Sequence, residues 1–189
     1  MKQLKTILIG ALMLVFSLAC SLNPVIIVTP VPGGTGGNSN SGSGGGRAPD
    51  GEQGQVTRVV DGDTIDVRLN DGETIRVRYL GMNTTETNRG ESCSQDGKQA
   101  NAALVDGQRV TLVADRDPED QYGRALRYVY VGDLFVNAEL VRQGWAEAVM
   151  YEPNDRHWEQ LIEIEQQAER ANRGCHGMND IFDDGSYRR

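Results

Sequence analysis

The sequence is poor in aromatic residues and histidine, and it has no excess of positive charge. Aromatic residues make up 6% of the 189 residues and hydrophobic residues 38%, which supports one modest core rather than several. The two histidines give little basis for a zinc centre or a histidine-based catalytic site. Because the formal net charge is −8, broad binding of polyanions through a basic surface is not expected. Any polyanion site must be a local concentration of positive charge.

Long apolar runs are also scarce, and a prominent one lies at the N-terminus. Lys2 and Lys5 precede an almost wholly apolar stretch of 13 residues, 7–19, which is shorter than the ~20 residues of a membrane-spanning helix. This layout predicts a secretory signal peptide over residues 1–19. A small residue directly before Cys20 resembles the processing site of bacterial lipoproteins, so we expect a lipid anchor at Cys20. A plain cleaved signal peptide is the alternative, and in both cases the protein is expected outside the cytoplasm, membrane-anchored or secreted.

The next segment has the composition of a tether. Residues 33–46 consist only of Gly, Ser, Asn and Thr and cannot bury a core. We therefore predict a flexible linker over residues 20–54, a folded domain over 55–176 and a loose polar tail over 177–189. The domain is expected to be a monomer.

The folded domain carries the pattern of short β-strands. Alternating apolar and polar residues, or short apolar runs, predict five strands, and Asn70-Asp71-Gly72 is a hairpin turn signal between two of them. The expected strands are 56–60, 65–69, 75–79, 110–113 and 126–131.

Three helices are expected around and after these strands. They are 98–104, a short helix that ends at 144, and 155–172. Ala100, Ala103 and Leu104 are expected on the inner face of the first helix, Asn137 as the N-cap of the second, and His157 at the solvated end of the third. This order favours a mainly β fold with α (α+β), a five-stranded OB-fold β-barrel with three helices.

Polar side chains that could bind a metal ion or a phosphate, or act in catalysis, lie at the ends of the predicted strands. In Asp61-Gly62-Asp63 two carboxylates flank a glycine, and such a turn can aim oxygens at a hard cation, although Asp-Gly pairs also form ordinary turns. Arg76 and Arg78 share one face of a strand, and a solvated outer face is the simpler interpretation for Arg76. Glu86 could act as a general base, and Arg124 at a glycine-bearing bend could bind a phosphate, or both could be ordinary surface residues.

Together and in this order, these segments resemble the staphylococcal nuclease (thermonuclease) family. The similarity extends from Val56 to Asn172. Its strongest segments are Val60-Asp61-Gly62-Asp63-Thr64, Arg78 with Thr84 and Glu86, Tyr122-Gly123-Arg124-Ala125-Leu126, and residues 136–144. The resemblance implies a calcium-dependent endonuclease or phosphodiesterase that hydrolyses DNA or RNA.

The resemblance also implies a calcium site. Asp63, Asn83 and the carbonyl group of Thr84 would be the Ca²⁺ ligands, and Asp61 would support these ligands without binding the ion itself. Asn83 occupies a position where the family usually has aspartate. Because an amide lacks the negative charge and calcium affinity depends on the charge of the ligands, weaker binding is expected.

Catalytic and substrate-binding roles are implied for residues on both sides of that site. Glu86 would position or deprotonate the attacking water, and Arg78 and Arg124 would grip the phosphate and stabilise the charge that develops on it. Tyr122 and Tyr151 would contact the substrate. Because Asp63, Arg78, Glu86 and Arg124 are all retained, we favour an active enzyme.

Two other functions are compatible with the sequence. The neutral Asn83 and the acidic composition would also suit a catalytically weakened OB-fold module that binds single-stranded nucleic acid, or a structural envelope protein. Cys93 and Cys175 are the cysteines of the predicted folded domain, and in an exported protein we expect them to form a disulfide; two free thiols are the alternative.

Overall fold

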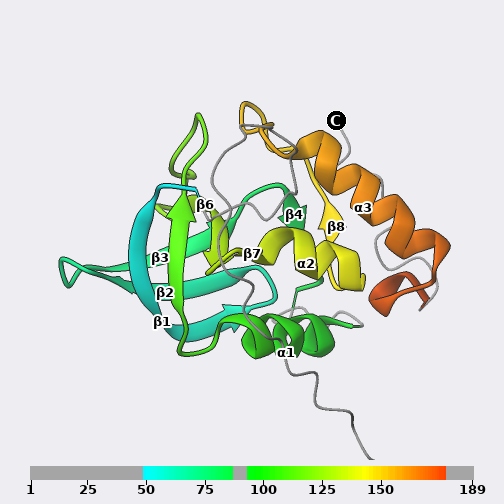
Figure 1. Ribbon diagram of the computed structural model, residues 1–189, viewed down its shortest axis with the longest axis horizontal. Helices are drawn as coiled ribbons and strands as arrows, with labels where there is room; N and C mark the ends of the chain where they lie inside the picture. Colours follow the sequence, from blue (N-terminus) through cyan, green and yellow to red (C-terminus); the bar gives the residue numbers. More distant parts are fainter. Residues whose placement is uncertain (1–48, 87–92, 178–189) are drawn as a thin grey trace, which may run out of the picture. The chain divides into compact units, whose positions relative to one another are not determined.

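The computed structural model describes residues 49–86 and 93–177 (Figure 1). The predicted signal peptide, Cys20, most of the predicted linker and the tail beyond residue 177 lie outside the described residues. None of the helices in the described ranges is long and apolar enough to cross a membrane.

Five strands form a closed barrel. They are β1 (Glu52–Asp61), β2 (Thr64–Leu69), β3 (Thr74–Tyr79), β5 (Arg109–Val113) and β6 (Ala125–Val131). Neighbours pair antiparallel in the order β3-β2-β1-β5-β6. β3 and β6 then pair in parallel, with Val77 opposite Ala125, and this pairing closes the barrel (Figure 1). The predicted α+β class with a five-stranded OB-type barrel and three helices is confirmed.

The alternating apolar residues fill the barrel. Ile65, Val67, Val77 and Tyr79 are fully buried, because they share the inner face of the β2–β3 hairpin. β1 begins at Glu52, within the stretch that the sequence predicted as linker. Its first residues pair with β5 and so belong to the barrel, although their polar side chains give no apolar alternation.

α1 (Ser94–Val105) packs against β1, and its inner face agrees with the predicted one in part. Ala100 and Leu104 are half-buried and pack against the core as predicted, whereas Ala103 is exposed. The buried residues of the helix are Ser94, Gly97, Asn101 and Val105. Asn101 lies on the buried side of the helix because its amide accepts a hydrogen bond from the Tyr79 hydroxyl at 2.9 Å and donates one to the Asp61 carbonyl oxygen at 3.0 Å. The helix therefore supports the Asp61 turn through a buried asparagine.

α2 (Val136–Gln143) ends at Gly144 in a left-handed conformation, φ 79°, as predicted, but Asn137 is not its N-cap. Phe135 is the N-cap, and Asn137 is fully buried. Its side chain accepts a hydrogen bond from the Val129 N–H and donates one to the Leu80 carbonyl oxygen, both at 2.9 Å. Asn137 thus fastens α2 to β6 and to the end of β3.

α3 (Trp158–Arg170) is shorter than predicted and packs against α2. His157, expected in solvent, is half-buried, with its ring 4.6 Å from that of Tyr128 and 4.8 Å from that of Phe135. The 3₁₀ helix η2 (Gly174–Gly177) follows. It carries Cys175, which forms a disulfide with Cys93 at the start of α1, with the Cα atoms 5.9 Å apart.

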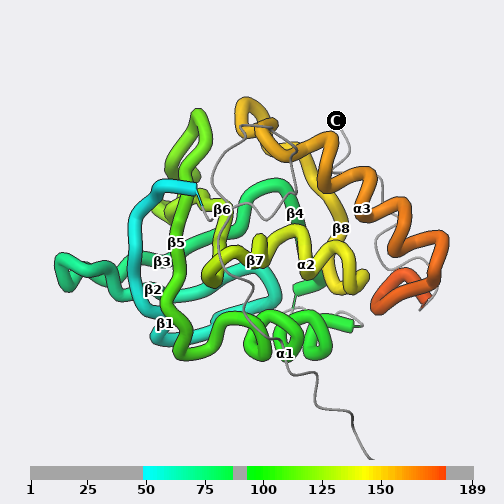
Figure 2. The backbone as a smooth tube through the Cα atoms, in the orientation of Figure 1, coloured from blue at the N-terminus to red at the C-terminus, as the bar shows by residue number. Residues whose placement is uncertain are grey.

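Three strands of two residues each were not predicted. β4 (Met82–Asn83) pairs with β8 (Glu147–Ala148), and β7 (Leu134–Phe135) extends the barrel sheet next to β6. Such strands are too short to show a periodic pattern in sequence. Figure 2 shows the chain passing from α2 through β8 towards α3, so that β8 brings this segment back to the end of β3.

Candidate active site

A buried carboxylate stands at the turn between β1 and β2. Asp63 is 2% exposed. Its Oδ1 accepts a hydrogen bond from the Thr64 hydroxyl at 2.9 Å, and its Oδ2 accepts the N–H and hydroxyl of Thr84, both at 3.0 Å. Only glycine fits at Gly62, because a Cβ there would stand 2.7 Å from Thr84 Oγ1. The turn and the Thr84 segment are therefore held in direct contact.

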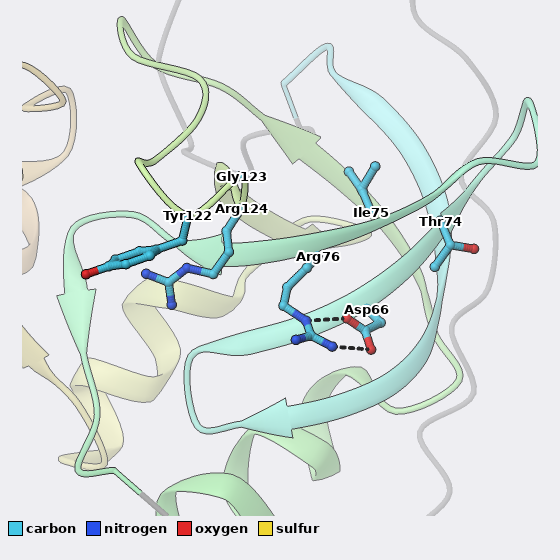
Figure 3. Close-up of a pocket in the computed structure, with 7 residues that line it drawn as sticks. All are labelled: Asp66, Thr74, Ile75, Arg76, Tyr122, Gly123 and Arg124. Carbon is cyan, nitrogen blue, oxygen red and sulfur yellow. Dashed lines mark hydrogen bonds and ion pairs between the residues drawn. The ribbon is translucent and has the colours of Figure 1, made fainter. Parts of the chain in front are cut away.

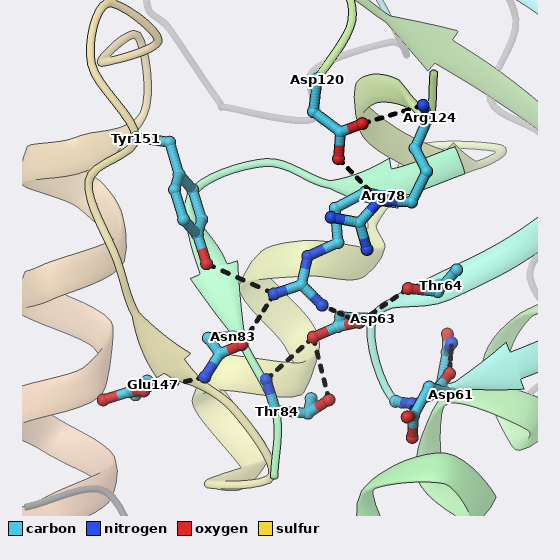
Figure 4. A network of polar contacts seen from close by, with 12 residues as sticks. Asp61, Asp63, Thr64, Arg78, Asn83, Thr84, Asp120, Arg124, Glu147 and Tyr151 are labelled. Carbon is cyan, nitrogen blue, oxygen red and sulfur yellow. Dashed lines mark hydrogen bonds and ion pairs between the residues drawn. The ribbon is translucent and has the colours of Figure 1, made fainter. Parts of the chain in front are cut away.

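Arg78 on β3 lies at the centre of this site. Its Nη1 forms an ion pair with Asp63, and its Nη2 donates hydrogen bonds to Asn83 Oδ1 at 2.7 Å and to the Tyr151 hydroxyl at 3.3 Å (Figure 4). Burial opposes the charged guanidinium, but the negative charge of Asp63 and the contact with Tyr151 outweigh it, so the pKa of Arg78 is raised. A fixed positive charge is thus held inside the protein.

A second buried carboxylate, which the sequence did not single out, contacts Asn83. Glu147 is 5% exposed and lies opposite Asn83 in the β4–β8 pair. Its Oε1 accepts a hydrogen bond from Asn83 Nδ2 at 3.1 Å (Figure 4). Burial raises the pKa of the Tyr151 hydroxyl; Arg78 works in the opposite direction, and the charges of Asp63 and Glu147 add to the rise. The sequence signal that could have pointed to Glu147 is the presence of an acidic residue inside the apolar segment 146–149.

Arg124 is fixed at the bend before β6. Its Nε donates to Asp120 Oδ2 at 2.6 Å, and Asp120 Oδ1 accepts the N–H groups of Arg124 and Tyr122, both at 2.9 Å. Although partial burial opposes ionisation, these bonds hold the pKa of Asp120 below its usual range. Asp120 therefore stays ionised and orients Arg124, a role that the sequence motifs did not indicate.

The closing strand pair brings Arg124 to the same face as Arg78. Ala125 is opposite Val77 in the parallel β3–β6 pair, so Arg124 stands level with Arg76, one step along the same face from Arg78. Figure 4 shows the Arg124 and Arg78 side chains extending from neighbouring strands towards the same region.

An open cavity of about 520 Å³ adjoins Arg124 (Figure 3). Arg76 lines it and is held by Asp66 through two hydrogen bonds of 2.8 and 3.2 Å. Tyr122 also lines it, is 76% exposed, and has its ring centroid 5.6 Å from Arg124 Cζ. The simpler interpretation of Arg76 as an exposed outer-face residue is confirmed, and that face borders the cavity.

The remaining predicted site residues lie close in sequence to this network. The Asp61 carboxylate accepts the Gly62 N–H at 2.9 Å, so it shapes the turn that presents Asp63. Glu86 is half-buried, two residues beyond Thr84, and its role stays a prediction. We call Asp63, Arg78, Asn83, Thr84, Glu147 and Tyr151 the Asp63–Arg78 network.

The donors of this network suit a hard cation only in part. Within residues 49–86 and 93–177, no three histidine, cysteine or acidic side chains converge in a way that would hold a metal ion. The oxygen atoms of Asp63, Asn83 and Thr84 do match the chemistry of calcium ligands. In this arrangement the guanidinium of Arg78 provides the positive charge next to Asp63.

Comparison with known proteins agrees with the geometry. The family model "Staphylococcal nuclease homologue" matches residues 76–175. Thermonuclease of Staphylococcus intermedius is 43% identical over 111 residues, which cover 57% of this chain and 66% of that protein. SPbeta prophage-derived endonuclease YokF of Bacillus subtilis is 41% identical over 119 residues, 60% of this chain and 40% of that protein. Thermonuclease of Staphylococcus hyicus is 36% identical over 120 residues, 61% of this chain and 70% of that protein.

The similarity is confined to part of several relatives, since the chain spans between 40% and 66% of the length of three of the curated proteins that it matches. The matched region nevertheless contains most of β3 with Arg78, and also Asn83, Arg124 and the segment of Glu147 and Tyr151. With more than half of the sequence matched by the family model, this chain belongs to the staphylococcal nuclease homologue family.

Proposed function

We propose that this protein is a nuclease, a phosphodiester hydrolase that cuts DNA or RNA with the aid of a metal ion. One observation carries the proposal: two fixed arginines, Arg78 and Arg124, share a face of the barrel beside the carboxylate of Asp63. Hydrolysis of a phosphodiester builds negative charge on the phosphate oxygens, and preorganised cations stabilise that charge. The relatives named thermonuclease and endonuclease support the same conclusion.

The two arginines are proposed to act differently. Arg78 is buried and held by Asp63, Asn83 and Tyr151, so it would provide a charge that needs no rearrangement during the reaction. The Arg124 side chain is 32% exposed and could donate two hydrogen bonds to a phosphate. Glu86 is proposed to orient or deprotonate the attacking water.

Calcium is the ion we propose, held by Asp63, Asn83 and the carbonyl group of Thr84. When bound, it would add positive charge at the phosphate. Asp61 would support the ligands by shaping the turn of Asp63. Because Asp63 already pairs with Arg78 and Asn83 is neutral, we expect the affinity for calcium to be low.

The substrate strand is proposed to extend from Arg124 into the adjoining cavity. The exposed ring of Tyr122 offers a stacking surface for a base, and Arg76 offers a positive charge at the rim. Tyr151 would approach the substrate from the opposite side of Arg78. On a protein with a net charge of −8, binding through these few cations should weaken strongly as salt is raised.

The N-terminal sequence supports a location outside the cytoplasm. We propose export directed by residues 1–19 and attachment to the membrane through a lipid on Cys20, with one copy of the domain acting alone. Mass spectrometry of the N-terminal peptide isolated from membranes tests the lipid. An unmodified Cys20 would leave a plain secretory signal as the explanation.

Digestion of DNA and RNA by the purified full-length chain tests the proposed function. Cleavage should require added Ca²⁺ and stop when a chelator is present. Arg124→Ala should remove most of the activity, whereas the matched variant Arg116→Ala should keep it, because Arg116 is 60% exposed and pairs with Asp155 on the surface. Retention of single-stranded nucleic acid without cleavage at any calcium concentration would instead identify a binding module.

A further inference from the structure

The acidic residue Glu147 belongs to the Asp63–Arg78 network by position. It is 5% exposed, and the antiparallel β4–β8 pair places it opposite Asn83. Figure 4 shows its carboxylate beside the Asn83 amide, and the two are joined by a hydrogen bond of 3.1 Å. Its burial therefore places a carboxylate next to Asn83 inside this site.

The amide of Asn83 links two groups of opposite charge. Its Oδ1 accepts a hydrogen bond from Arg78 at 2.7 Å, and its Nδ2 donates to Glu147 at 3.1 Å. An aspartate at position 83 could accept from Arg78 but could not donate to Glu147. It would also bring two carboxylates within hydrogen-bonding distance of each other, which disfavours ionisation of both. The residues at positions 83 and 147 are therefore chemically dependent on each other.

We propose that Glu147 supplies the second negative charge of the cation site, which position 83 does not carry. This inference rests on the proposed metal-dependent function. A cation held by the oxygens of Asp63 and Asn83 would lie near Glu147, because the Asn83 amide contacts that carboxylate directly. The charge count of the ligand set governs calcium affinity, so a carboxylate on β8 compensates for the amide on β4.

Direct titration of the purified full-length chain with Ca²⁺, by calorimetry, tests this assignment without relying on cleavage. Glu147→Gln keeps the size of the side chain and an oxygen that accepts from Asn83, so folding and the position of Asn83 should be preserved. It should weaken Ca²⁺ binding at least about tenfold. The matched control Glu152→Gln, an exposed carboxylate in the segment after β8, should bind Ca²⁺ like the wild type.

The double variant Asn83→Asp/Glu147→Gln moves the charge from β8 to β4 and should restore much of the lost affinity. A merely structural role for Glu147 would alter thermal stability and leave the Ca²⁺ titration unchanged. Equal Ca²⁺ affinity of Glu147→Gln and wild type, or no Ca²⁺ binding by the wild type, would overturn the inference. A wild type that binds Ca²⁺ through Glu147 but cuts no nucleic acid would refute the proposed nuclease and leave the cation site standing.

Discussion

Replacement of Arg78 by alanine should destabilise the whole domain, whereas replacement of Arg124 should chiefly reduce cleavage. Arg78 is 8% exposed and pairs with Asp63, which is 2% exposed, so its removal leaves a buried carboxylate without its ion-pair partner. Breaking a buried pair in this way costs about 3–5 kcal/mol, a large part of the ~5–15 kcal/mol that stabilises a typical domain. The ion pair of Arg124 with Asp120 is partly exposed, and its loss should cost less than about 1 kcal/mol.

Urea unfolding followed by tryptophan fluorescence measures the first effect, and cleavage of labelled DNA measures the second. Adding Asp63→Asn to Arg78→Ala should recover part of the stability, because the stranded charge is removed. Arg124→Ala should slow cleavage about 10²–10³-fold, the usual cost of losing one donor that stabilises a transition state. If the unfolding free energy of Arg78→Ala differs from that of the wild type by no more than the roughly 0.5 kcal/mol that is ordinary for surface substitutions, the argument from burial is wrong.

Two further predictions concern the stability of the domain. Cys93→Ser/Cys175→Ser should lower the unfolding free energy by up to about 4 kcal/mol, since the disulfide spans 82 residues, and a reductant should lower the melting temperature of the wild type alone. Burial holds the pKa of His157 below its usual value, so its neutral form stabilises the fold above about pH 6.5, and this contribution is lost as the pH falls through the lowered pKa. Between pH 7.5 and about 5, the melting temperature should therefore fall less steeply in His157→Phe than in the wild type. Equal slopes would contradict the assignment.

The barrel was predictable because its strands obey a local rule. Residues such as Ile65, Val67 and Val77 alternate with polar residues, and the closed sheet buries that face throughout. The family resemblance predicted that Asp63, Arg78, Glu86 and Arg124 serve one site. The β3–β6 register brings Arg124 close to Arg78, and the place of Glu86 in that site stays a prediction. These features follow from short-range periodicity and from the motifs themselves.

Other features depend on contacts between distant segments, which no local pattern encodes. Asparagine favours helix caps, so the sequence predicts that role for Asn137, yet its amide bridges β6 and the end of β3. The polar Asn101 faces the barrel because Tyr79 and the Asp61 carbonyl bind it there. The two-residue pair β4–β8 that encloses Glu147 leaves no periodic signal, so only the place of this acidic residue in the apolar segment 146–149 pointed to its burial.

The parallel closure of β3 against β6 has a consequence for biosynthesis. The Asp63–Arg78 network and Arg124 draw on the turn at 61–63, the end of β3, the bend at 120–124 and the segment 147–151. These segments meet only after strands far apart in the chain have joined. An unfinished polypeptide on the ribosome lacks the later segments and cannot assemble this site. Any chemistry that needs all four parts is therefore withheld until nearly the entire domain has been made and has folded.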